Sequence, residues 1–122
     1  QEVVIDSPYI TRERVRIFMP IFEHLINKGV KIFVLTRQPK EHDFGMKYQA
    51  EDEIKNFESM GVTVLPFIGY VHRKLAIIDR TILWEGSLNI LSQGISREIM
   101  RRIENIELTM QMFKFLKLEK FL

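Results

Sequence analysis

Short apolar runs alternate with amphipathic stretches along the first half of the chain. Strands rich in β-branched residues and helices with a 3.6-residue apolar period are predicted at residues 3–5, 11–27, 30–36, 47–60 and 62–67. Thr11 is the expected N-cap of the first helix, and Pro20 lies inside it, so we expect a kink or a restart there. The turn cluster Asp6-Ser7-Pro8 ends the first strand, and residues 37–46 show no period and indicate a loop. Strands alternating with helices are typical of an α/β domain.

The second half begins with two strands of a different kind. They are predicted at residues 71–78 and 81–85, joined tightly at Asp79-Arg80. The tail from residue 96 holds one more apolar segment and a final helix, whose expected core-facing residues are Leu108, Met112, Phe115 and Leu116. Taken together, the pattern predicts one α/β domain over residues 1–122, with a mixed β-sheet flanked by helices.

Composition excludes several classes of protein. The 122 residues are 46% hydrophobic and 28% charged, which supports a packed core and argues against general disorder. No apolar run reaches the roughly 20 residues of a membrane span. The absence of cysteine removes disulfides, thiol nucleophiles and cysteine-based zinc sites, and fits a cytoplasmic location. The chain begins without methionine, so we expect a fragment of a longer protein.

Charge adds little by itself. The net charge is +2, which names no partner. The acidic run at residues 51–53 is expected to be an early, solvated turn of the second helix. A histidine–aspartate pair at residues 42–43 is too weak a signal for a metal, so no metal site is predicted.

Candidate chemistry is concentrated between residues 72 and 89. His72 and Lys74 are two residues apart on a predicted strand and therefore share a face. Ser87 and Asn89 are spaced in the same way on the next strand. If these strands pair, an imidazole, an ammonium, a hydroxyl and an amide converge in one pocket, which suits an anion whose charge grows during a reaction, such as phosphate. Within this set His72 is the plausible nucleophile.

The pattern H-x-K-x4-D-x6-G-S-x-N resembles the signature of the phospholipase D superfamily. It is formed by His72, Lys74, Asp79, Gly86, Ser87 and Asn89, without gaps. The resemblance implies a phospholipase D/nuclease-like domain that cleaves phosphodiesters without metal or cofactor, through a covalent phosphohistidine.

By the same resemblance, His72 is the nucleophile in one motif copy and the acid or base in the other. Lys74 and Asn89 would bind phosphate oxygens and Ser87 would add a hydroxyl contact, whereas Asp79 and Gly86 would be structural. Family nucleases carry a downstream glutamate that orients the histidine. Glu98 is the best candidate, with Glu104 and Glu107 as alternatives.

The chain holds one such motif, so an active site requires a homodimer through the motif face, or a second motif elsewhere in the parent protein. Arg73, Arg97 and Arg101 are candidates for binding DNA or RNA, and a solvated surface is an equally good interpretation of them. Trp84 would stack on a base, or lie in the core or a dimer interface.

The preferred hypothesis is a metal-independent endonuclease acting on DNA or RNA as a homodimer. Residues 83–92 resemble phospholipase D-like domains attached to helicase-type ATPases, so one alternative is a non-catalytic nucleic-acid-binding module of such a protein. A phospholipid phosphodiesterase is another.

Overall fold

A six-stranded mixed sheet forms the centre of the computed structural model, which describes residues 1–39, 44–67, 73–92, 94 and 97–120. The strands are β1 (Glu2–Asp6), β2 (Lys31–Arg37), β3 (Thr63–Phe67), β4 (Leu75–Ile78), β5 (Ile82–Gly86) and β6 (Met100–Glu104). The helices are α1 (Arg12–Asn27), α2 (Phe44–Met60), α3 (Ile106–Phe115) and a short 3-10 helix, η2 (Leu118–Lys120). The α/β fold with a mixed sheet, predicted from the sequence, is therefore confirmed.

Strand direction divides the sheet into two halves. The strand order is β3-β2-β1-β4-β5-β6, with β1, β2 and β3 parallel to one another. The pairs β1–β4, β4–β5 and β5–β6 are antiparallel. The parallel half comes from strand–helix–strand crossovers, and the antiparallel half from a tight hairpin and a longer return.

This topology brings one end of each of the six strands to the same side of the sheet, which we call the motif end. It comprises the carboxyl ends of β1, β2, β3 and β5 and the amino ends of β4 and β6. In register, Asp6 lies opposite Leu75, and Gly86 lies opposite Met100. The opposite side, which we call the turn end, holds Glu2, the β4–β5 turn and Glu104.

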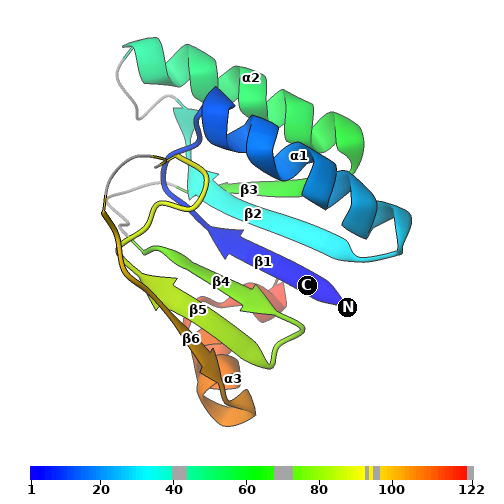
Figure 1. Ribbon diagram of the computed structural model, residues 1–122, viewed down its shortest axis with the longest axis vertical. Coiled ribbons are helices and arrows are strands. Elements are labelled where there is room, and N and C mark those ends of the chain that lie inside the picture. The colour runs from blue at the N-terminus through cyan, green and yellow to red at the C-terminus, as the bar shows by residue number, and fades with distance from the viewer. Residues whose placement is uncertain (40–43, 68–72, 93, 95–96, 121–122) are drawn as a thin grey trace.

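The two faces of the sheet carry separate cores. On one face α1 and α2 pack against the sheet through buried residues such as Val15, Phe22 and Phe57. On the other face Phe113 of α3, with Leu116 and Leu118 that follow it, packs on β1, β2, β4 and β5. In Figure 1, α1 and α2 lie in front of the sheet and α3 lies behind it.

Both long helices differ from the sequence prediction, the first at two points and the second at one. The first helix runs through Pro20 as one element, so the restart expected there is wrong. Pro20 is on the exposed side, where the carbonyl it leaves without a partner can bond to water. Thr11 precedes the helix as predicted, but its hydroxyl donates to the carbonyl of Ser92 and makes no capping bond. The second helix begins at residue 44 rather than 47; residues 40–43 lie outside the described residues.

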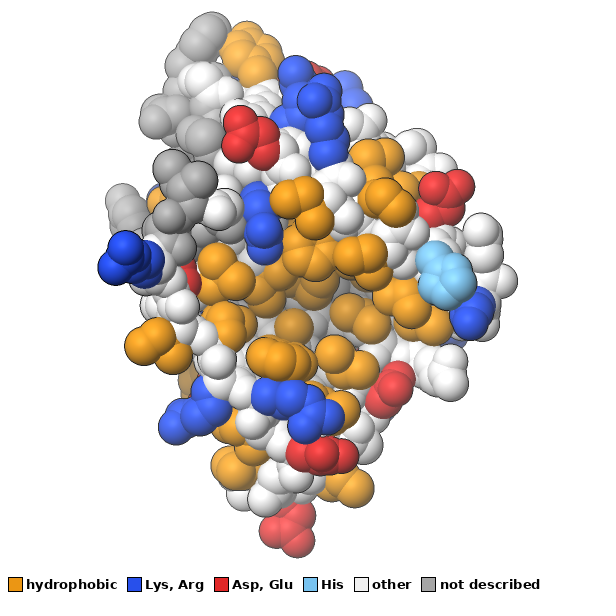
Figure 2. Space-filling view, in the orientation of Figure 1, with side chains coloured by type: hydrophobic (Ala, Val, Ile, Leu, Met, Phe, Trp, Pro, Cys, Tyr) orange, Lys and Arg blue, Asp and Glu red, His pale blue; other side chains and the backbone are white. Residues whose placement is uncertain are grey.

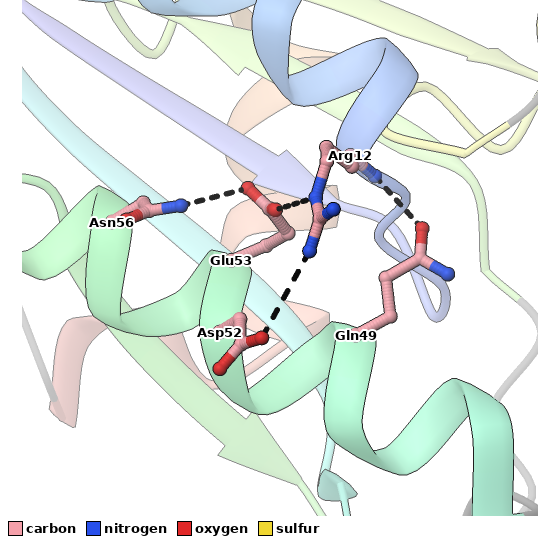
Figure 3. Close-up of polar contacts among 5 residues, drawn as sticks. All are labelled: Arg12, Gln49, Asp52, Glu53 and Asn56. Atoms are coloured by element: carbon pink, nitrogen blue, oxygen red, sulfur yellow. Dashed lines mark hydrogen bonds and ion pairs between the residues drawn. The ribbon is translucent and has the colours of Figure 1, made fainter.

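The acidic run at residues 51–53 is not uniformly solvated. Glu53 is 2% exposed, and its two carboxylate oxygens accept from Arg12 Nε at 3.3 Å and Asn56 Nδ2 at 3.1 Å. Gln49 accepts the backbone N–H of Arg12 at 2.8 Å, so α2 caps the start of α1 (Figure 3). The expectation for Glu53 failed because its partner lies 41 positions earlier in the chain.

The final helix packs two of the four residues predicted to face the core, Met112 and Leu116, against it and exposes the other two. Phe113 and Leu116 are buried and Met112 packs against the same core, but Leu108 is 46% and Phe115 is 70% exposed. The side chain of Asn105 caps the helix by accepting from Leu108 N at 3.0 Å, which holds that residue in the exposed first turn. None of the described helices is long and apolar enough to cross a bilayer.

Candidate functional site

We call the part of the motif that contains Lys74 the first motif segment, and it leads into the sheet at the motif end. His72 lies outside the described residues, together with the start of the strand predicted at residues 71–78. Lys74 is partly buried and precedes β4, which begins at Leu75. Its carbonyl accepts the N–H of Gly86 at 3.3 Å, so this bond ties the first motif segment to the second.

Side chains alternate across the sheet in β4 as the sequence pattern predicts. Leu75 and Ile77 belong to the core beneath α3, whereas Ala76 belongs to the core beneath α1. Residue 74 is two positions before Ala76, and residues two apart in an extended segment share a face. Lys74 is therefore expected on the α1 side of the sheet.

The second motif segment does not continue as a strand, which corrects the sequence interpretation. The strand β5 ends at Gly86, and Ser87 and Asn89 lie in the bend that follows. Ser87 bonds with Ile99, just before β6: its N–H donates to the Ile99 carbonyl at 2.9 Å, and its Oγ accepts the Ile99 N–H at 3.1 Å. The side chain thus replaces a backbone acceptor and ends the strand. Its hydroxyl is exposed to solvent.

Gly86 lies where two backbone segments approach each other closely. A Cβ at this position would collide with the carbonyl oxygen of Ile99 and lie 2.9 Å from Met100 Cα. Both obstacles are backbone atoms, which cannot swing aside as a side chain can. The glycine is therefore required by packing between β5 and the start of β6.

Asn89 is held by a buried segment. The Ser92 N–H donates to the Asn89 carbonyl at 3.0 Å, closing a turn. The next residues, Ile90 and Leu91, are buried against α1. Thr11 N–H donates to the Leu91 carbonyl at 2.8 Å, so the amide-bearing turn is fixed to the start of the first helix.

Asp79 lies at the turn end, the length of β4 away from Lys74. Its Oδ1 accepts the N–H of Glu2 at 2.8 Å, and its own N–H donates to the Glu2 carbonyl at 2.8 Å. Asp79 and Arg80 have φ of 53° and 55°, so the β4–β5 turn uses two left-handed residues. These contacts join the turn to β1, and they are the kind that a structural aspartate makes.

The three candidate glutamates are divided between the two ends. Glu98 is partly buried and precedes Ile99, which bonds to Ser87, so it lies at the motif end. Glu104 lies opposite Ile82 at the turn end and pairs with Arg102 at 3.2 Å. Glu107 follows it in the first turn of α3. Of the three, Glu98 is placed beside the motif.

The arginines proposed for nucleic acid differ in their surroundings. Arg97 is exposed just before β6. Arg101 is largely exposed and pairs with Glu85 at 3.0 Å. Arg73 is 35% exposed, and its Nε lies 3.1 Å from Oδ2 of Asp6, so this side chain is turned into the protein.

Sequence reasoning missed Asp6 and Ser7 as members of the site. They stand in an Asp-Ser-Pro cluster that indicates a turn, and both are 0% exposed in the fold. Burial raises the pKa of Asp6 from 3.8 to about 6, while the charge and hydrogen bond of Arg73 act in the opposite direction. No local signal marks them, because their partners lie more than 60 positions away.

A metal site is not evident in the part of the chain that the structure describes. No group of three or more His, Cys, Asp and Glu side chains is placed there to hold an ion.

Comparison with models of known protein families shows which family the chain belongs to. A family model described as "Cardiolipin synthase, PLD-like domain" matches residues 1–117. The chain belongs to this PLD-like family. No curated protein matches it.

Solved structures share the PLD-like fold. The phospholipase D family member Nuc from Salmonella typhimurium has a TM-score of 0.71 and 15% identity, over 96% of this chain and 76% of that one. NucT from Helicobacter pylori has a TM-score of 0.69 and 15% identity, over 95% and 76%. Polyphosphate kinase from Porphyromonas gingivalis has a TM-score of 0.70 and 12% identity, over 96% and 21%. At these identities the likeness shows the fold and leaves the activity to be tested.

Proposed function

We propose that this PLD-like domain is a metal-independent phosphodiesterase that cleaves DNA or RNA as a homodimer. The observation that carries the proposal is the meeting of both motif segments at the motif end, where the carbonyl of Lys74 accepts the N–H of Gly86. Membership of the PLD-like family and the fold shared with Nuc and NucT support it.

In the proposed reaction, His72 attacks phosphorus and forms a phosphorus–nitrogen bond as the bond to the leaving oxygen breaks. The partner subunit's His72 protonates that oxygen, and then takes a proton from the water that hydrolyses the phosphohistidine. Lys74 and Asn89 bind the non-bridging oxygens, whose negative charge grows in the transition state. The Ser87 hydroxyl adds a donor, and Glu98 orients the histidine.

A second copy is required because the chain holds one motif. The structure offers a surface for it. On the α1 side of the sheet, β4, β5 and β6 present the partly buried apolar side chains of Ile78, Ile82, Trp84 and Met100. Trp84 and Met100 lie at the margin of the core beneath α1, and Figure 2 shows hydrophobic side chains gathered in this region around a hollow.

The first helix extends this apolar surface. Ile17 is 55% and Ile21 is 50% exposed, on the side of α1 that also carries Arg14, whose Nε donates to the Ile90 carbonyl. A contiguous exposed apolar patch is typical of an interaction site. The patch reaches Gly86 and Met100 at the motif end, so a copy bound there would bring its own motif close to this one. We assign Trp84 to this interface.

Nucleic acid is favoured over phospholipid by exposed Arg97 and Arg101 near the motif. Binding through such arginines weakens with salt, because bound phosphates release counterions. A phospholipid phosphodiesterase would instead turn over a phosphatidyl substrate with little salt-sensitive DNA binding. A non-catalytic module, as in a parent protein with an attached helicase-type ATPase, would bind DNA or RNA and leave it intact.

The test is cleavage of labelled DNA and RNA in EDTA. Wild-type protein should cut, and His72→Ala should lower the rate on the order of a thousandfold or more while retaining salt-sensitive binding. His24→Ala is the matched control, because His24 is exposed on α1. Binding without cleavage by the wild type would favour the non-catalytic module.

Subunit mixing tests the dimer directly. Wild type and His72→Ala are unfolded together, refolded at fixed total concentration and assayed. If both histidines serve one site, activity falls with the square of the wild-type fraction; independent protomers give a linear fall. A linear fall, or a monomeric mass by light scattering in an active preparation, contradicts the shared site.

A further inference from the structure

We propose that Asp6 and Ser7, the last residue of β1 and the one after it, are positioning residues that hold the two motif segments at a fixed separation. The inference rests on the proposed function. It assigns a role to two residues that lie far from the motif in the sequence and carry no motif signal.

The first link runs from Asp6 to the histidine–lysine segment. Asp6 is 0% exposed, and its Oδ2 accepts from Arg73 Nε at 3.1 Å. Arg73 stands next to Lys74 and leads into β4, so fixing its side chain restrains the start of the described part of this segment. The link adds to the backbone pairing of Asp6 with Leu75 in β4.

The second link runs from Ser7 to the asparagine segment. Ser7 Oγ accepts the N–H of Leu91 at 3.2 Å and donates to the Tyr9 carbonyl at 3.0 Å. Leu91 follows Asn89 by two residues, inside the buried turn. Ser7 N–H donates to the Leu35 carbonyl at 3.0 Å, which fixes the residue to β2. Adjacent residues of one rigid strand end therefore hold the two halves of the motif.

The chemistry of Asp6 argues against a role in stability alone. A second buried acid, Glu53, also pairs with an arginine, but each of its oxygens has a hydrogen-bond partner (Figure 3). Asp6 Oδ1 is buried and accepts no hydrogen bond from the residues that the structure describes. Burial of a carboxylate that is only half satisfied is unfavourable, and an uncharged residue would serve the fold better.

Positioning has a catalytic consequence because phosphoryl transfer depends on geometry. A displacement on the order of 1 Å between a nucleophile and the groups that bind the phosphate can lower a rate about a hundredfold. Loosening either link should therefore lower kcat more than it raises KM.

The experiment measures kcat and KM for cleavage in EDTA by Asp6→Asn, Arg73→Gln, the double variant and Ser7→Ala. Glu53→Gln is the matched control, a buried acid–arginine pair outside the motif. Thermal unfolding accompanies each assay. Amide hydrogen exchange is followed at residues 73–76 and 89–92, where it reports local motion without requiring activity.

We expect Asp6→Asn and Arg73→Gln each to lower kcat about tenfold to a hundredfold with KM changed less than threefold. The double variant should lose no more than either single one, because both break one link. Combining Ser7→Ala with either variant should lower kcat further, because Ser7 holds the other motif segment. The Asp6 variant should speed exchange at 73–76, and the Ser7 variant at 89–92. Glu53→Gln should stay within twofold of the wild-type kcat.

Two results would overturn the inference. One is full kcat in Asp6→Asn and Ser7→Ala while the wild type and the control are active. The other is a kcat loss that follows unfolding equally in all variants, which indicates a general structural role. Wild-type protein that fails to cut overturns the proposed function instead. In that case local exchange changes support the two links, and unchanged exchange refutes them.

Discussion

At both ends of the sheet, side chains join β1 to the β4–β5 hairpin, but the two ends use different contacts. At the turn end, Glu2 pairs with Arg80 at 3.0 Å and its backbone exchanges bonds with Asp79. Both side chains of that ion pair reach solvent, at 16% and 40% exposed. At the motif end, Asp6 pairs with Arg73 from a position with no exposure.

The difference shows which end is shaped by stability. The turn end satisfies its groups within a tight turn and one neighbouring strand, and it leaves its charges hydrated. The motif end buries a carboxylate, breaks off β5 for a non-regular segment, and requires a glycine where two backbones nearly touch. Unfavourable local choices that persist in a fold are typical of functional sites.

The largest expected effect separates the two ends by activity. Lys74→Ala should lower the cleavage rate about a hundredfold to a thousandfold, because it removes a cation from the developing charge. Lys31→Ala, at an exposed site on the turn-end side of β2, should change it less than twofold. Equal losses in rate assays of the two variants would remove the distinction between the ends.

A pair of glycines tests the close approach at the motif end. Gly86→Ala should lower the free energy of unfolding by about 1–3 kcal/mol, because the new methyl group meets the Ile99 carbonyl. Gly45→Ala adds a methyl group that meets nothing, in α2, and should raise stability by up to about 1 kcal/mol. Denaturant titration of both variants measures the difference, and two changes of the same sign would contradict it.

The buried acid should leave a signature in the pH dependence of stability. Because the pKa of Asp6 is raised from 3.8 to about 6, the folded state holds its proton more tightly than the unfolded chain. The stability this contributes is complete below about pH 4 and is lost as the pH rises to about 6, by up to about 3 kcal/mol. In denaturant titrations, the free energy of unfolding of Asp6→Asn should therefore rise relative to that of the wild type as the pH increases from 4 to 7. A constant difference across this range would refute the account.

The smallest effect belongs to the turn end. Asp79→Asn keeps an Oδ1 acceptor for the Glu2 N–H and a residue that tolerates the left-handed conformation, so stability should change by less than about 0.5 kcal/mol. Asp79→Ala loses both the acceptor and this tolerance, and should lower the free energy of unfolding by about 1–2 kcal/mol. If thermal unfolding gives equal losses, the hydrogen bond contributes nothing measurable.

Much of the fold could be predicted because its signals are local. β-branched runs, amphipathic periods and the Asp79-Arg80 turn mark the elements up to β5. The last helix was harder, since apolar residues occur on more than one of its sides. The start at Asn105 and the contacts of Phe113 decide which side is buried.

The site could be predicted only as far as its residues lie in one spaced motif. The register that places Lys74 beside Gly86 follows from the hairpin, and was predictable. The bend at Ser87 depends on a bond to Ile99, 12 residues later, and the contacts of Asp6 and Ser7 span 67 and 84 positions. Such contacts arise from tertiary packing and leave no trace in a local pattern.

The two outer strands of the sheet restrict how the protein can assemble. The edge strand β3 contains Pro66, which has no N–H to offer to an added strand. The other edge strand, β6, carries Arg101 and Arg102, which are 73% and 45% exposed. Charges and prolines at sheet edges oppose strand-to-strand polymerisation. Growth of the sheet from copy to copy is thereby discouraged, which leaves the faces of the sheet for the dimer proposed above.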